Sequence, residues 1–169
     1  MSGFTTSARV VYIVLLGVTL GATLFLLLVL HPSALVHLPS EQSATELVRS
    51  MAASLDFFVL LGSPLLLVCL LVGYLSSGYS LRLPLIAVLL LAGAASISHF
   101  WLEPEMLDIR QSLGQPIQYL DVNNPMRLRY TNFTTLSNWL HWFRVIASVY
   151  LLGQGVVSAS PKRSLGLRF

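Results

Sequence analysis

Charged residues are scarce in this sequence, and their scarcity excludes a soluble domain. Only 10% of the 169 residues are charged, 55% are hydrophobic, and the mean hydropathy is +0.75. A soluble globular domain typically carries about 25% charged residues on its hydrated surface. We therefore expect an integral membrane protein that has the lipid bilayer as its surroundings.

Cysteine and the short motifs of common enzymes are also rare or missing. Cys69 is the single cysteine, which excludes a disulfide within the chain and a cysteine-ligated metal. The sequence contains no Gly-x-Ser-x-Gly, His-Glu-x-x-His or phosphate-loop pattern, so nothing in it indicates an enzyme of those classes. The basic residues are spread over tails and loops without a clustered stripe, and we expect no nucleic-acid partner.

What the chain does contain is a set of long apolar runs, each close to the roughly 20 residues that cross a bilayer. The first is too long for the apolar core of a signal peptide, so we expect it to be retained. The sequence predicts a single all-α membrane domain over 1–169, a polytopic antiparallel bundle of four transmembrane helices. These helices are expected at about 10–30, 55–75, 83–102 and 135–157, with a helical hairpin outside the membrane at 103–134.

Local signals mark several helix ends. Ser40 is typical of an N-cap for a helix that runs into the second apolar stretch, and Asn124 is typical of a cap for the last helix. Pro104, next to Glu103, predicts a new helix start after the third run. Pro64 lies inside the second run and predicts a kink there.

Basic residues beside the membrane indicate an orientation. One side of the predicted bundle receives five basic residues and no acid, namely Arg9, Arg82, Lys162, Arg163 and Arg168, and all seven acids fall on the other side. By the positive-inside rule, both termini are expected on the cytoplasmic side, with the 103–134 hairpin on the opposite side.

Gly17 and Gly21 form a Gly-x-x-x-Gly pair in the first run. This spacing lets helices approach closely, and we expect it to serve packing inside the bundle. A contact with a second copy or with another membrane subunit is the alternative.

The last run carries polar residues in a regular pattern. Ser137, His141, Arg144 and Ser148 are spaced four, three and four, so they share one face of a helix. A guanidinium facing lipid would cost a few kcal/mol. We therefore expect a buried polar network, in which an acid from the same side pairs with Arg144, either Asp56 or Glu103.

The predicted topology places all four histidines on the non-cytoplasmic side. His99 and His141 are expected about one turn inside neighbouring helices, where two histidines could ligate haem. With His31 added, the set could hold copper or zinc. The structural alternative is that these histidines only hydrogen-bond neighbouring groups and seal the bundle.

Three stretches are similar to a known family. These are 31–58, "FWLEPEMLDIRQSLG" and "NPMRLRYTNFTTLSNWLH", in which Pro104, Arg110 and the pair Leu140-His141 carry the pattern. The chain resembles the transmembrane protein 205-like family, four-helix membrane proteins catalogued as a domain of unknown function. That family places a small hydroxyl residue three positions after the histidine, where this chain has Arg144. The resemblance implies a fold and a membrane location, and no chemistry.

Together these features favour a non-enzymatic integral membrane protein over an enzyme. We expect an accessory subunit or a protein that handles a small solute or metal. The alternative is a membrane redox protein that binds haem or copper through His99 and His141.

Overall fold

The computed structural model of the chain, which describes residues 2–77, 82–113 and 117–157, is built from helices, with no strand in these ranges. The predicted all-α class is confirmed. In chain order the elements are α1 (Ser2–Phe25), the π-helical turn η1 (Leu26–Leu30), α2 (His31–His37), α3 (Glu41–Ser77), α4 (Arg82–Ile97), the π-helical turn η2 (Ser98–Leu102), α5 (Glu103–Leu113), the 3₁₀ turn η3 (Ile117–Tyr119) and α6 (Pro125–Val157).

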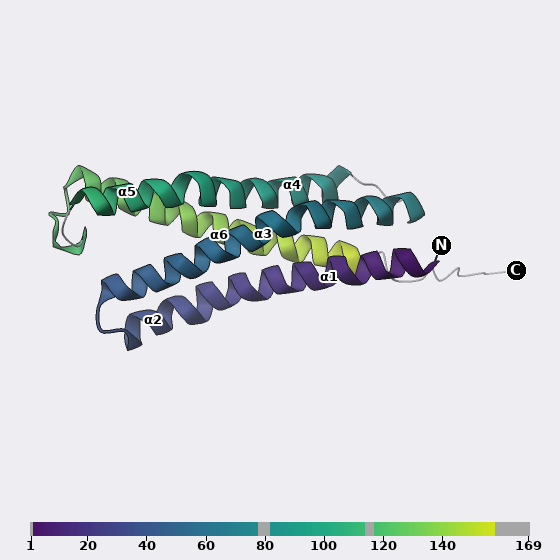
Figure 1. The fold of residues 1–169 in the computed structure, drawn as a ribbon, viewed down its shortest axis with the longest axis horizontal. Coiled ribbons are helices and arrows are strands. Elements are labelled where there is room, and N and C mark those ends of the chain that lie inside the picture. Colours follow the sequence, from purple (N-terminus) through teal and green to yellow (C-terminus); the bar gives the residue numbers. More distant parts are fainter. Residues whose placement is uncertain (1, 78–81, 114–116, 158–169) are drawn as a thin grey trace, which may run out of the picture.

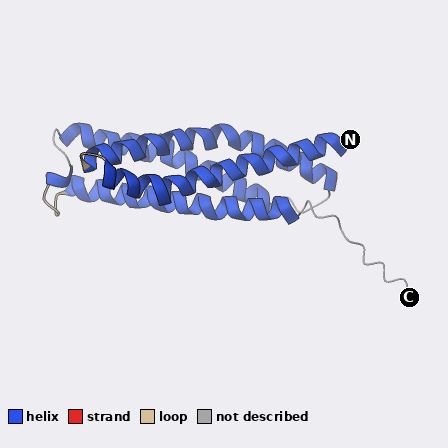
Figure 2. Cartoon of the chain, turned by 90° about the horizontal axis from the view of Figure 1, so that it is seen from below, coloured by secondary structure: helices blue, strands red, loops and turns tan. Residues whose placement is uncertain are grey.

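These elements lie side by side as four long rods in an elongated bundle (Figure 1, Figure 2). The rods are α1–η1–α2, α3, α4–η2–α5 and α6. Both α1 and α4 pack against α3 and α6, so α3 and α6 face each other across the centre of the bundle. The Tyr12 hydroxyl, early in α1, lies 3.5 Å from the carbonyl oxygen of Leu151, late in α6. The first and last rods therefore run in opposite directions.

Three helical segments are long and apolar enough to cross a membrane, and each has 32 residues: Thr6–His37, Gln42–Gly73 and Arg82–Leu113. They contain nearly all of the first three expected runs. The fourth expected run, 135–157, lies in α6, which is not one of these three segments. Asn138, His141 and Arg144 lower the hydropathy of that helix.

Each π-helical turn ends two residues before a proline. The backbone N–H of His31 donates to the Leu26 carbonyl, and that of Glu103 donates to the Ser98 carbonyl; Pro32 and Pro104 follow. A proline has no N–H, and its ring crowds the carbonyl four residues earlier. A wider turn at this point relieves that crowding. The chain consequently continues from α4 into α5 without a break, whereas the sequence predicted a new helix start at Glu103.

The predicted caps are confirmed. The Ser40 hydroxyl accepts a hydrogen bond from the Ser43 N–H at 3.1 Å, and the Asn124 side-chain oxygen accepts one from the Met126 N–H at 2.9 Å. Helix α3 passes through Pro64 and keeps its 37 residues as one element. At 1.5 Å per residue it is about 55 Å long, longer than a hydrocarbon core of about 30 Å.

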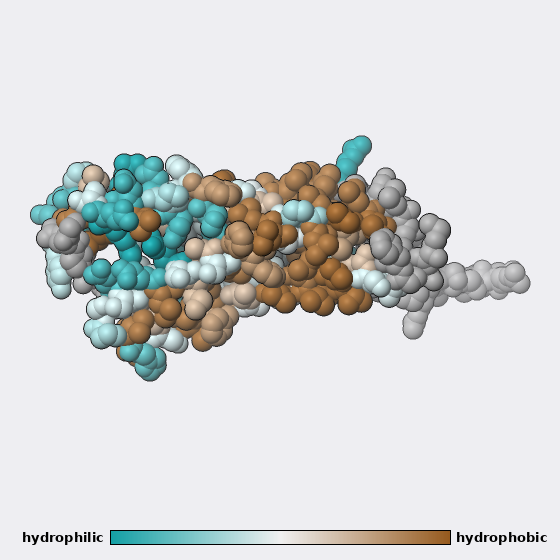
Figure 3. Space-filling view, in the orientation of Figure 1, coloured by the Kyte–Doolittle hydropathy of each residue, from teal (hydrophilic) through white to brown (hydrophobic). Residues whose placement is uncertain are grey.

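The surface of the bundle divides into a polar end and an apolar body. Figure 3 shows hydrophilic residues gathered at the end that carries α2 and α5, and hydrophobic residues over most of the remainder. Inside the body, buried apolar side chains from all four rods fill the centre, among them Leu16, Leu66, Leu91 and Leu151. A polar end beside an apolar belt is the pattern expected of a membrane protein.

The Gly-x-x-x-Gly pair does not pack inside the bundle, so that expectation is wrong. A Cβ atom added at Gly17 or Gly21 would meet nothing within 4 Å. Close approach occurs instead at Gly155, where a Cβ would lie 3.2 Å from the Tyr12 ring. The rotation of α1 about its axis decides this, because it directs the Gly17 and Gly21 face outward.

Candidate functional site

A buried ion pair between Arg144 of α6 and Asp56 of α3 lies inside the bundle. The two side chains are 0% and 2% exposed. Because α3 and α6 face each other across the bundle, the pair connects opposite rods through its centre. Of the two acids that the sequence offered as partners for Arg144, the structure selects Asp56.

Two further contacts hold the guanidinium. Its NH2 donates to the Ala94 carbonyl oxygen of α4 at 3.3 Å, and its NH1 lies 3.4 Å from Nδ1 of His141. A guanidinium can only donate hydrogen bonds, so Nδ1 of His141 is the acceptor and the neutral ring carries its proton on Nε2. Arg144 therefore links three of the four rods and also sets the tautomer of His141.

A cavity of about 270 Å³ opens above this ion pair, and both Asp56 and His141 line it. Polar side chains from three rods form much of its wall, namely Thr45, Arg49, Ser98, Glu103, Tyr130, Ser137 and Asn138. Apolar side chains complete the lining, among them Leu26, Leu27, Val48, Met106 and Trp142. Residues of both π-helical turns, Leu26 and Ser98, contribute to it, so the two distorted turns help to shape the cavity.

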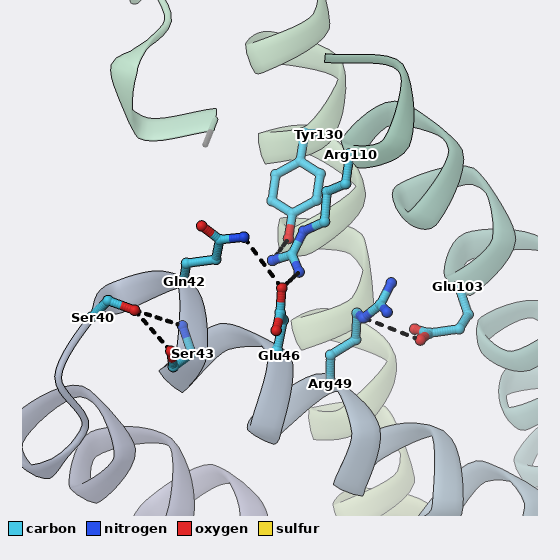
Figure 4. Close-up of polar contacts among 8 residues, drawn as sticks. All are labelled: Ser40, Gln42, Ser43, Glu46, Arg49, Glu103, Arg110 and Tyr130. Atoms are coloured by element: carbon cyan, nitrogen blue, oxygen red, sulfur yellow. Dashed lines mark hydrogen bonds and ion pairs between the residues drawn. The ribbon is translucent and has the colours of Figure 1, made fainter. Parts of the chain in front are cut away.

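A second pair of opposite charges lies in the cavity wall. Nε of Arg49 on α3 is 3.4 Å from Oε1 of Glu103 at the start of α5, and Figure 4 shows the two side chains pointing toward each other. Unlike the central pair, this one is partly exposed, at 22% and 25%. Glu103 thus belongs to the cavity wall and not to the Arg144 ion pair.

At the polar end, Arg110 and Arg129 form contacts between helices. Arg110 of α5 donates to the Tyr130 hydroxyl of α6 at 2.7 Å and lies 3.9 Å from Glu46 of α3 (Figure 4). Arg129 of α6 donates to Glu105 of α5 at 2.7 Å. These contacts bring the start of α6 against α5, as the sequence predicted for the hairpin.

The remaining polar residues predicted on α6 have different surroundings. Ser137 is half-buried and lines the cavity. Ser148 is completely buried, and its hydroxyl has no hydrogen-bond partner among the described residues. Of the predicted network, only Asp56, His141 and Arg144 are joined directly by side-chain contacts that reach the ion pair.

The predicted histidine ligands do not form a cluster. His31 is exposed and lines the cavity, whereas the His99 ring packs against Phe57 and Phe100, with centroids 6.2 and 5.0 Å apart. Within residues 2–77, 82–113 and 117–157, no group of three or more histidine, cysteine, aspartate or glutamate side chains is placed to hold a metal ion. The geometry therefore gives no support to the trio of His31, His99 and His141 as metal ligands.

Sequence reasoning assigned no role to Arg49, which the structure places in the cavity wall. A signal was present in the spacing: Thr45, Arg49, Ala52 and Asp56 are three or four residues apart and share one face of α3. All four line the cavity. A polar face on α3 opposite the polar face of α6 predicts a hydrated space between them.

Comparison with known proteins identifies no relative: no family model, no curated protein and no solved structure matches the chain.

Proposed function

We propose that this chain is a four-helix integral membrane protein that takes up a small polar solute in the cavity above the Asp56–Arg144 pair. The observation that carries the proposal is the cavity itself: about 270 Å³ of space lined by both apolar and polar side chains, ending on a buried ion pair. Mostly apolar pockets with a few convergent polar groups are the usual binding sites for small molecules. Ionisable groups within a membrane region commonly mark the path or site of a solute.

The proposal requires α6 to cross the membrane as the fourth span. Its outward face supports this, because Trp139 and Ile146 are 68% and 67% exposed and apolar. Its charged group, Arg144, faces inward and is neutralised by Asp56. Pairing inside a bundle is how membrane helices accommodate a charge.

The orientation follows from charges at the two ends of the bundle. Arg9, early in α1, and Arg82, at the start of α4, lie at the end of the bundle opposite α2 and α5, whereas the acids Asp56 and Glu103 line the cavity. Lys162, Arg163 and Arg168, which also support this orientation, are outside the described residues. With the basic end in the cytoplasm, both termini are cytoplasmic and the cavity opens on the non-cytoplasmic side.

The resemblance to the transmembrane protein 205-like family remains part of the proposal. It rests on Pro104, Arg110 and Leu140-His141, and it agrees with a small four-helix membrane protein. The cavity favours solute handling over a purely accessory role, because an accessory subunit needs no polar space inside its own bundle.

Cysteine accessibility tests whether the cavity is hydrated and where it opens. In a Cys69→Ala background, Ser137→Cys places a thiol in the cavity wall, and Trp139→Cys places one on the outward face two residues away. A membrane-impermeant methanethiosulfonate reacts with thiolates, which form in water and not in lipid. Applied to intact cells, it should modify Ser137→Cys and leave Trp139→Cys unmodified.

Two results would contradict the proposal. If Ser137→Cys is unreactive in both intact and permeabilised cells, the cavity contains no water. If it reacts only after permeabilisation, the cavity opens on the cytoplasmic side and the proposed orientation is wrong.

A further inference from the structure

The charges around the cavity indicate which class of solute it accepts, an inference that rests on the proposed function. The wall carries one cation and one anion side by side, Arg49 and Glu103, 3.4 Å apart. At the floor, the charge of Asp56 is already balanced by Arg144. The charges of these side chains therefore sum to zero, but Arg49 and Glu103 present one charge of each sign to a ligand in the cavity.

The wall cation has unused hydrogen-bonding capacity. Within the described part of the chain, Nε and NH1 of Arg49 are buried from solvent and have no hydrogen-bond acceptor, because the contact with Glu103 does not have hydrogen-bond geometry. A buried N–H without an acceptor is unfavourable, and a carboxylate is the acceptor that best matches a guanidinium. These donors become accessible to an acidic group in the cavity only when the Arg49–Glu103 pair opens.

The acid beside it excludes a simple anion. Glu103 lines the cavity next to Arg49, so a solute bearing only a carboxylate would be repelled by Glu103 as it bound Arg49. A solute bearing only an ammonium group would meet Arg49. A ligand with one charge of each sign avoids both repulsions and can use both members of the wall pair.

We propose that the cavity binds a small zwitterion of the amino-acid type, with its carboxylate on Arg49 and its ammonium group on Glu103. The wall pair can open to admit it, because partly exposed ion pairs are only weakly held together. The apolar part of such a solute would contact Val48, Met106 and Trp142 on the cavity lining.

Calorimetric titration of the full chain in detergent tests this with four probes of similar size. L-Alanine carries both charges, propionate carries only the carboxylate, isopropylammonium carries only the ammonium group, and lactamide is neutral. We expect L-alanine to bind at least about tenfold more tightly than each of the others, as the loss of one charge-assisted hydrogen bond implies.

Variants of the wall pair assign the two contacts. Arg49→Gln should weaken L-alanine binding about tenfold or more. Glu103→Gln should also weaken it, and should improve propionate binding, because the repelling acid is gone; a protein that merely folded poorly would not gain an affinity. The matched control is Arg129→Gln, which breaks the exposed pair with Glu105 at the same end of the bundle and should leave binding unchanged.

Several outcomes would overturn the inference. If propionate, isopropylammonium or lactamide binds as tightly as L-alanine, the cavity does not recognise the carboxylate and the ammonium group of the ligand together. If no probe binds while Ser137→Cys is still modified, the zwitterion is wrong and a hydrated cavity for another solute remains. If Ser137→Cys is also unreactive, the proposed function fails with it.

Discussion

At the scale of single residues, Arg144 is the most deeply buried charged group among the residues that the structure describes. Its side chain is fully buried and carries a positively charged guanidinium. Removing a charge from water costs several kcal/mol, which is offset only by a close partner of opposite sign and by hydrogen bonds. Asp56, His141 and the Ala94 carbonyl provide those contacts from three rods, so the stability of the bundle depends on the ion pair remaining complete.

Arg144→Leu is therefore expected to lower the free energy of unfolding by about 3 to 5 kcal/mol, because Asp56 is left as a buried charge without its partner. Thermal or denaturant unfolding in detergent measures the loss. Adding Asp56→Asn to this variant should restore part of it, because the uncompensated charge is then removed.

Glu103→Gln serves as the control for this cycle. Glu103 pairs with Arg49 and not with Arg144, so it should restore no stability to Arg144→Leu. An Arg144→Leu protein as stable as the wild type would instead show that the guanidinium reaches water through the cavity.

The sequence was sufficient to identify Arg144 as a buried charge, because its helical spacing with His141 and Ser148 is a local property. It could not choose between Asp56 and Glu103. Both acids were expected on the same side of the membrane, and which one reaches Arg144 depends on how α3 and the rod α4–η2–α5 are rotated about their axes. That rotation is set by packing between rods.

At the scale of elements, short-range hydrogen bonds decide where the helices begin. The Ser40 cap starts α3, which supplies Arg49 and Asp56 to the cavity. Ser40→Ala should destabilise the protein by about 0.5 to 2 kcal/mol and should speed hydrogen exchange of the Ser43 amide, which loses its acceptor.

Ser54→Ala is the matched control for the cap. Ser54 is exposed in the interior of α3, and its hydroxyl donates only to the Ser50 carbonyl of the same helix. Since alanine has the higher helix propensity, this variant should be neutral or slightly stabilised. Equal losses in both variants would show that the cap contributes nothing specific.

The two π-helical turns were not predicted from the sequence of the elements that contain them. Pro104 was interpreted as the start of a new helix, since proline usually interrupts a helix, and Pro32 stands in the same position after the first run. In the structure each is accommodated by a wider turn just before it, and the rods continue. A neighbouring rod can stabilise such a distortion, and propensities of the local sequence do not include it.

At the scale of the whole molecule, the distribution of charge between the two ends predicts how the bundle lies in a membrane. Thr6→Cys, near the start of α1, and Asn123→Cys, in the turn before α6, lie at opposite ends of the bundle. With Cys69→Ala as background, an impermeant maleimide should label Asn123→Cys in intact cells, and Thr6→Cys only after permeabilisation.

Labelling of both positions from the same side would contradict a bundle in which each rod crosses the membrane. Labelling of Thr6→Cys alone in intact cells would be consistent with the bundle but would indicate the opposite orientation. The cavity would then open on the cytoplasmic side.

The sequence by itself determined the all-helical class, the caps at Ser40 and Asn124 and the polar face of α6, since all of these follow from composition, local hydrogen bonds and the 3.6-residue period. Tertiary structure alone decided that Arg144 pairs with Asp56, that Arg49 and Glu103 share a cavity wall, that His99 packs among aromatic rings and that Gly17 faces outward. The physical reason is that these outcomes depend on the rotation and register of one rod against another. Many weak contacts between distant parts of the chain set that geometry together, and no local pattern encodes it.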